Sequence, residues 1–186
     1  MAERFEFELV FALPDSNTDP VDLSNAIFEA GFDDAIVATG LPGLVAVELD
    51  MTGQPAEGPI LDAVRRLLAV LPAGSRLREV RPDLVSLADV AERLGVRRQA
   101  LQKRAMPAPS FGGLYRVDEI AESLHAAAEP GAGRRRPRFD LSRAENWLRA
   151  GPVARRINAR LTLNEIDPWS GRTTPDGKGP GVETVA

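Results

Sequence analysis

The chain has 186 residues, of which 44% are hydrophobic and 27% charged, and its formal net charge is −4. This composition is that of an ordinary globular protein of one or two domains. The absence of cysteine excludes disulfides, thiolate nucleophiles and cysteine-ligated zinc. Because the start lacks a signal-peptide pattern and no apolar run could span a bilayer, we expect a soluble, cytoplasmic protein.

Charge is distributed unevenly along the chain. Residues 1–80 carry 5 basic and 14 acidic side chains, whereas residues 128–161 carry 9 basic and 3 acidic ones. The segment between them, residues 81–127, is nearly balanced, with 7 basic and 6 acidic side chains. This asymmetry predicts at least two modules with different partners.

Residues 1–82 are predicted to form an α/β domain. The stretch RFEFELVFAL alternates apolar and polar residues as a half-buried strand does, and Asp19 before Pro20 is typical of a helix start. Two short β-rich runs flank GLPG as a hairpin, a helix follows from about Pro59, and RLREVRP is a last, weaker strand. The order βαββαβ predicts a ferredoxin-like fold, an antiparallel sheet with both helices on one face, and this fold alone fixes no function.

Nothing in the sequence favours an enzyme. The single histidine, His125, has no carboxylate pair or serine motif beside it, so we interpret it as a surface residue. The acidic residues Glu6, Glu8, Asp33 and Asp34 are interpreted as a solvated sheet face and loop rather than a metal site. We therefore expect no catalytic residues, no metal and no cofactor, and the acidity argues against this domain lying on DNA.

Residues 83–128 are predicted to form a winged helix-turn-helix. Ser86 can cap a first helix, the small Ala91 leaves room for a steep crossing, and Gly95 allows a sharp turn. The second helix would bury Leu101. Its outward side chains would be Arg97, Arg98, Gln99, Gln102 and Lys103. Guanidinium, ammonium and amide groups are what a recognition helix uses on phosphates and base edges, although a helical hairpin with a solvated basic face remains the alternative.

A small hairpin is predicted after the second helix. In MPAPSFGGLYRVDEIAESL, a Gly-Gly turn is flanked by Phe111 on one side and by Tyr115 and Arg116 on the other. Such a hairpin is a wing that can press against the DNA backbone, with core packing as the alternative for Tyr115. Asp118 is predicted to cap the helix that follows.

The stretches SLADVAERLGVRRQALQKRA and PAPSFGGLYRVDEIAESL resemble the winged helix-turn-helix of the MerR and excisionase (AlpA-like) superfamily. Residues 4–127 as a whole, about two thirds of the chain, resemble actinobacterial helix-turn-helix proteins with a small α/β domain in front of such a reader. The resemblance implies a DNA-binding regulator whose second helix faces the major groove, with Tyr115 and Arg116 in the wing. Arg104 stands where that superfamily usually buries an apolar residue, so either the helix ends early or Arg104 is an added phosphate contact.

The remaining segments have three expected roles. The linker 129–139 carries an arginine cluster, either a phosphate-binding arm or a solvated loop: Arg134, Arg135, Arg136 and Arg138. Residues 140–163 are predicted to be helical and broken in two at Pro152, with Trp147 packing on the winged domain or on the same helix of a second chain. Residues 164–186 are expected to be disordered unless a partner orders them, with Trp169 as the one anchor.

The sequence thus predicts an α+β protein with a ferredoxin-like domain, a winged helix-turn-helix and C-terminal helices. We expect a nucleoid-associated, sequence-specific reader of double-stranded DNA, most simply a homodimeric transcriptional regulator. The alternative is an adaptor whose front domain and tail bind other proteins. A ligand-sensing regulator has less support, because nothing in residues 1–80 marks a pocket.

Overall fold

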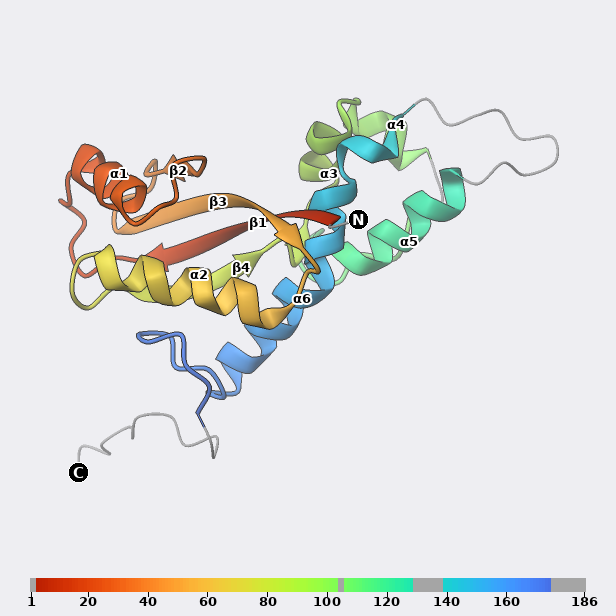
Figure 1. Cartoon of the computed structure of the whole chain (residues 1–186). Helices are drawn as coiled ribbons and strands as arrows, with labels where there is room; N and C mark the ends of the chain where they lie inside the picture. Colours follow the sequence, from red (N-terminus) through yellow and green to blue (C-terminus); the bar gives the residue numbers. More distant parts are fainter. Residues whose placement is uncertain (1–2, 104–105, 129–138, 175–186) are drawn as a thin grey trace.

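The computed structural model describes residues 3–103, 106–128 and 139–174 of the chain. It is an α+β structure built from a four-stranded sheet, a two-stranded sheet and helices around both (Figure 1). The elements in chain order are β1 (Glu3–Ala12), α1 (Pro20–Glu29), β2 (Ile36–Ala38), β3 (Leu44–Gly53), α2 (Glu57–Val70), β4 (Arg76–Arg81), β5 (Leu84–Val85), α3 (Leu87–Leu94), α4 (Arg98–Gln102), β6 (Tyr115–Arg116), α5 (Val117–Ala128), η1 (Leu141–Arg143) and α6 (Glu145–Thr162).

Residues 3–81 form what we call the sheet unit. Its elements follow the expected order βαββαβ, and the strands lie in the order β2-β3-β1-β4 with every pairing antiparallel. Local signals predicted its boundaries well: the carboxylate of Asp19 accepts a hydrogen bond from the backbone N–H of Val21, with Pro20 at the first helical position. Gly43, in the left-handed region at φ 74°, closes the turn between β2 and β3.

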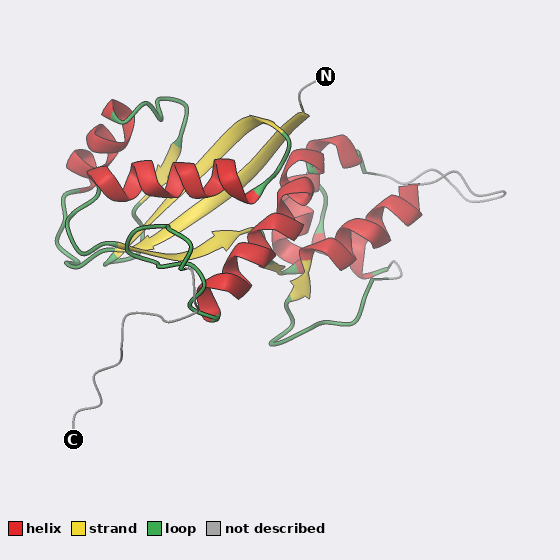
Figure 2. Ribbon diagram, turned by 60° about the horizontal axis from the view of Figure 1, so that its bottom comes forward, coloured by secondary structure: helices red, strands yellow, loops and turns green. Residues whose placement is uncertain are grey.

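One face of this sheet carries the larger hydrophobic core. Alternate residues of β1 point into it, and they pair across the sheet with the apolar residues of β3, as in Phe7 opposite Leu49 and Leu9 opposite Val47. Helices α1, α2 and the C-terminal part of α6 contribute to the same core, and α2 and α6 cross this face of the sheet in Figure 2. The fold therefore needs a third, C-terminal helix to cover its sheet.

Residues 83–128 form what we call the helical unit. Here β5 and β6 pair antiparallel, with Val85 opposite Tyr115, and so bring the start of α3 next to the start of α5. Their apolar faces and Leu101 of α4 form a second core with the first turns of α6, including Trp147 and Leu148. The predicted N-cap at Asp118 is wrong, because α5 begins at Val117, directly after β6, and Asp118 is already its second residue.

Helix α6 belongs to both cores, and the predicted break at Pro152 is wrong. The chain forms one helix from Glu145 to Thr162 with Pro152 inside it. Proline removes one backbone hydrogen bond, but Ala150 and Val153 are buried on either side of it, so packing against two units holds the helix together. Gly151 lies against Val117 of α5, where an added Cβ would come within 2.1 Å of a methyl carbon of that valine.

The expectation of disorder from residue 164 onwards is wrong for residues 164–174. This segment turns back on the sheet unit, where Ile166 is fully buried in the larger core and the carbonyl of Pro168 accepts a 2.8 Å hydrogen bond from the N–H of Leu77. Trp169 is 48% exposed, beside the guanidinium of Arg76. Within the described residues, no helix combines the length and apolar character that a membrane crossing requires.

Candidate nucleic-acid interface

Three residues set the two ends of α3 and thereby the position of the turn that leads to α4. Ser86 caps α3 by accepting hydrogen bonds from backbone N–H groups, and Asp89 bonds back to the N–H of Ser86, which completes a capping box. At the other end Gly95 is left-handed at φ 64°, and the N–H of Val96 reaches back 2.8 Å to the carbonyl of Ala91. This is a Schellman motif, which ends the helix and redirects the chain within two residues.

Helix α4 presents a polar surface to solvent. Its one fully buried side chain, Leu101, fixes its rotation against the second core. The predicted contact residues on it are all exposed: Arg97, Arg98, Gln99, Gln102 and Lys103. None of these five has a hydrogen bond or ion pair from its side chain to any residue that the structure describes, so the three cations are available to a partner.

The hairpin predicted as a wing lies next to α4. Residues 110–114 close a tight turn, in which the N–H of Leu114 donates to the carbonyl of Phe111 at 2.8 Å. A hollow of about 400 Å³ separates this turn from the helix, and its walls include Arg98, Gln102, Gly112 and Tyr115. The structure therefore brings side chains of α4 and of the hairpin to one surface.

The two residues assigned to the wing differ in exposure from those on α4. Tyr115 is half-buried and packs against the second core, which favours the core-packing alternative for its ring. Arg116 is also half-buried, with its Nε 3.9 Å from a carboxylate oxygen of Glu119. Arg104 and the linker arginines Arg134, Arg135, Arg136 and Arg138 lie outside the described residues; α4 itself ends at Gln102.

The sequence did not indicate two features of this surface, the position of Arg143 and the exposure of Phe111. The guanidinium of Arg143 lies directly over the turn, so that an added Cβ at Gly95 would meet it at 2.2 Å. Phe111, directly before the Gly112–Gly113 turn of the hairpin, is 80% exposed. Arg143 is 48 residues away from Gly95 in the sequence and follows a different segment, so no local pattern could have placed it there.

The helical unit is attached to the sheet unit on the face opposite the larger core. Arg93 of α3 pairs with Glu6 and, at 2.7 Å, with Glu48, and it lies 5.5 Å from the centre of the Trp147 ring. Burial, followed by a hydrogen bond to Glu48, raises the pKa of Glu6. The same hydrogen bond lowers the pKa of Glu48. The carboxylates predicted to be a solvated sheet face thus serve partly as a docking site for α3.

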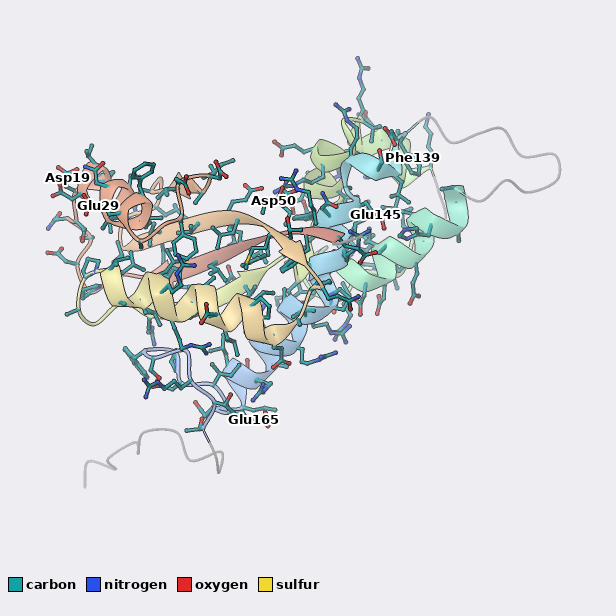
Figure 3. All side chains as sticks on the ribbon, viewed as in Figure 1. Asp19, Glu29, Asp50, Phe139, Glu145 and Glu165 are labelled. Carbon is teal, nitrogen blue, oxygen red and sulfur yellow. The ribbon has the colours of Figure 1, made fainter. Side chains whose placement is uncertain are left out.

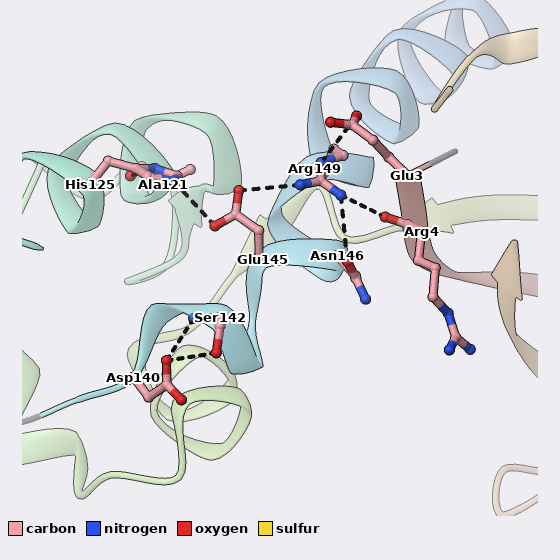
Figure 4. A network of polar contacts seen from close by, with 9 residues as sticks. All are labelled: Glu3, Arg4, Ala121, His125, Asp140, Ser142, Glu145, Asn146 and Arg149. Carbon is pink, nitrogen blue, oxygen red and sulfur yellow. Dashed lines mark hydrogen bonds and ion pairs between the residues drawn. The ribbon is translucent and has the colours of Figure 1, made fainter. Parts of the chain in front are cut away.

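Helix α6 adds polar links between the units (Figure 4). Arg149 donates a 2.8 Å hydrogen bond to the carbonyl of Arg4 and lies 3.7 Å from Glu3. Glu145 lies between Arg149 and the ring of His125, whose other nitrogen lies 2.7 Å from the carbonyl of Ala121. His125 is a half-exposed surface residue, as expected, and the network fixes α5 and α6 to the end of β1.

A second hollow, of about 880 Å³, lies between the units, where the sequence showed no sign of a pocket. Its walls come from both units, so it could not appear in residues 1–80 alone. Carboxylates outnumber arginines on these walls: Glu8, Glu48, Glu79, Asp83, Asp89 and Glu92 against Arg81 and Arg93. This hollow is unsuited to a polyanion, in contrast to the surface of α4.

The acidic residues of α1 lie far from α4. Asp19 and Glu29 are at the end of the sheet unit that is remote from the helical unit (Figure 3), so their charge does not oppose an anionic partner on α4.

Comparison of the chain with protein-family models, with curated proteins and with solved structures finds no match. The geometry of the α4 surface is therefore the main guide to function.

Proposed function

We propose that the chain is a sequence-specific reader of double-stranded DNA, most simply a transcriptional regulator, with a ferredoxin-like front domain and a winged helix-turn-helix. The observation that carries this proposal is the surface of α4: Arg97, Arg98 and Lys103 are exposed and unpaired among the described residues, next to the amides of Gln99 and Gln102. Cations supply affinity for phosphates, and amides can read adenine edges in the major groove.

Four further features support this proposal. The Schellman turn at Gly95 separates α3 from α4 as a helix-turn-helix requires. Leu101 turns the polar side of α4 outward, and Arg143 adds a cation above the turn. The charged side chains of α4 and its two caps, Arg97, Arg98 and Lys103, are all positive, although the whole chain has a net charge of −4.

Selection from a pool of random duplexes at two salt concentrations tests the proposal. We expect an enriched motif, with an affinity that falls steeply as salt rises because phosphate contacts release counterions. Replacing Arg97 and Arg98 together by Ala should weaken binding to all sequences at least tenfold and reduce the salt slope by roughly 2. Replacing Gln99 or Gln102 by Ala should instead change the preferred sequence.

The matched control is the double replacement Arg76→Ala with Arg78→Ala, which removes the same charge from exposed positions on β4. The proposal fails if no motif is enriched at either salt concentration, or if the α4 and β4 double variants bind duplexes equally well. An even twofold symmetry in an enriched motif would support the proposed homodimer.

A second candidate function, a protein adaptor, has one specific observation in its favour. The sheet unit exposes several large apolar side chains near α1 and β2, among them Phe28 at 60%, Ile36 at 64% and Leu41 at 66%. An adaptor would bury such side chains against a protein partner. It predicts an association that does not depend on salt and that survives the loss of Arg97 and Arg98.

A further inference from the structure

We infer that Phe111 is an apolar wedge that enters the base stack of duplex DNA beside the segment that α4 contacts. The inference rests on the proposed function and adds a residue and a mode of contact to it. Single exposed hydrophobic residues are common on protein surfaces, so exposure alone does not carry the argument. The inference rests on the backbone of the turn, the position of the hairpin next to α4 and the charge around it.

The backbone of Phe111 belongs to a closed turn. Gly112 and Gly113 both have positive φ, 57° and 79°, a pair of left-handed residues that suits a tight hairpin. The N–H of Ser110 donates to the carbonyl of Leu114 at 2.7 Å, and that of Leu114 donates to the carbonyl of Phe111 at 2.8 Å. The backbone at Phe111 is therefore restrained by the turn, so less backbone freedom remains to be lost on binding.

The turn projects away from the protein. A Cβ added to Gly112 or Gly113 would have no protein atom within 4 Å, and Phe111 itself is 80% exposed. The same two glycines border the hollow whose other wall includes Arg98 and Gln102 of α4. The hairpin that carries Phe111 thus borders the same hollow as α4, on the side of the molecule that would face DNA under the proposed function.

Charge separates the roles of the turn and of α4. The segment 106–114, MPAPSFGGL, has no charged side chain, so it cannot hold phosphates as α4 does. Phenylalanine is among the side chains that proteins insert between base steps from the minor groove, which unstacks the step and bends the duplex by roughly 20–90°. An uncharged turn with an aromatic tip suits this contact.

The surrounding charge also distinguishes duplex DNA from a second copy of the chain. Arg98 lines the hollow beside the hairpin, and Arg97 and Lys103 are exposed at the two ends of the same helix; all three are unpaired among the described residues. A second copy docking here would bring the same cations together without their counterions, whereas a polyanion would neutralise them. The occupant that fits both the cations and the ring is a nucleic acid duplex.

The experiment measures affinity and bending together. A duplex of 30 base pairs with random central sequence carries a fluorophore at each end, so that anisotropy reports binding and energy transfer reports the bend. The full-length chain is compared with Phe111→Ala, Phe111→Leu and the matched control Phe28→Ala, which removes a 60% exposed ring from α1. Circular dichroism checks that each variant is folded.

We expect Phe111→Ala to bind about tenfold more weakly and to leave the duplex straight, because the stacking of the ring is lost. Phe111→Leu should keep much of the bend, since leucine is also a wedge, and Phe28→Ala should behave as the unmodified chain. In Phe111→Trp, adding duplex should quench the new tryptophan.

Three results would overturn the inference. If Phe111→Ala and Phe28→Ala bind and bend alike while the Arg97, Arg98 double variant loses binding, DNA reading stands and the wedge is refuted. If the chain binds no duplex at all, the proposed function and the wedge fail together. If Phe111→Ala changes only the oligomeric mass measured by light scattering, the ring belongs to an interface between copies.

Discussion

The sheet unit and α4 use their charged side chains in different ways. In the sheet unit, arginines and carboxylates pair with each other and with neighbouring elements, as in Arg4 with Asp50 at 2.7 Å and Arg81 with Glu8 at 2.9 Å. On α4, Arg97, Arg98 and Lys103 have no such pairing among the described residues. Exposed ion pairs contribute little to stability, so this difference concerns partners more than folding.

Arg93 shows the contrast within a few residues of the chain. It lies two residues before Gly95, yet its guanidinium faces the sheet unit and pairs with Glu6 and Glu48. Arg97 and Arg98 follow the turn and face solvent. The change of direction at Gly95 therefore separates an arginine that holds the two units together from arginines that remain available to a partner.

The largest effect is expected from the segment after α6. Ile166→Ala should lower the free energy of unfolding by about 3 kcal/mol, because a fully buried side chain is removed from the larger core. Leu163→Ala, three residues earlier and at a 61% exposed position, is the control and should change it by less than about 0.5 kcal/mol. Equal effects of the two substitutions in urea unfolding would show that residues 164–174 do not support the sheet unit.

The next effect tests whether α6 joins the units through close packing. Gly151→Ala should destabilise the chain by about 2 kcal/mol, because the new Cβ overlaps Val117. Gly58→Ala, at a glycine of α2 with no atom near an added Cβ, is the matched control and should be neutral or slightly stabilising.

Adding Val117→Ala should restore part of the stability of Gly151→Ala, since it removes the methyl groups that the new Cβ meets. The double-mutant cycle, measured by thermal unfolding, isolates this contact. Additive losses would mean that the two residues do not meet.

Local features of both units could be predicted from the sequence, whereas contacts between distant segments could not. Caps and turns are local, so Asp19, Ser86 and Gly95 indicated where elements begin and end, and the apolar spacing around Leu101 indicated which side of α4 is exposed. The contacts of Gly151 with Val117, and of Ile166 with the larger core, join segments that are distant in the sequence. No local pattern reports such contacts. The low helix propensity of Pro152 predicted a break, but α6 is continuous there because its packing against both cores outweighs that propensity.

The candidate site divides in the same way. The exposure of Arg97, Arg98, Gln99, Gln102 and Lys103 followed from one helical period, whereas the position of Arg143 over the turn depended on how η1 docks. The acidic residues of β1 were predicted to be solvated, but Glu6 forms an ion pair with Arg93, which lies 87 residues later in the sequence. Alternation along a strand tells which residues share a face and does not tell what covers that face.

A smaller effect should distinguish the two kinds of arginine directly. Arg93→Met should lower the free energy of unfolding by about 1 kcal/mol, because it leaves two half-buried carboxylates side by side without a cation. Arg98→Met, the control on α4, should change it by less than about 0.5 kcal/mol. Arg98→Met should weaken duplex binding more than Arg93→Met does. A loss of binding confined to Arg93→Met would mean that the proposed DNA contact lies on α3, before Gly95, and not on α4.

The smallest effect concerns the pH dependence of the contact between the units. Burial raises the pKa of Glu6 in the folded chain, so its contribution is present below the ordinary pKa and is lost as pH rises through the raised value. The hydrogen bond from Glu6 lowers the pKa of Glu48, so its contribution is present above the ordinary pKa and is lost as pH falls through the lowered value. Relative to the unmodified chain, Glu6→Gln should therefore gain stability as pH rises from acid to neutral, and Glu48→Gln should lose it. Urea unfolding of both variants across that range measures the two slopes, and slopes of the same sign would mean that burial and the Glu6–Glu48 hydrogen bond do not shift the two pKa values in opposite directions.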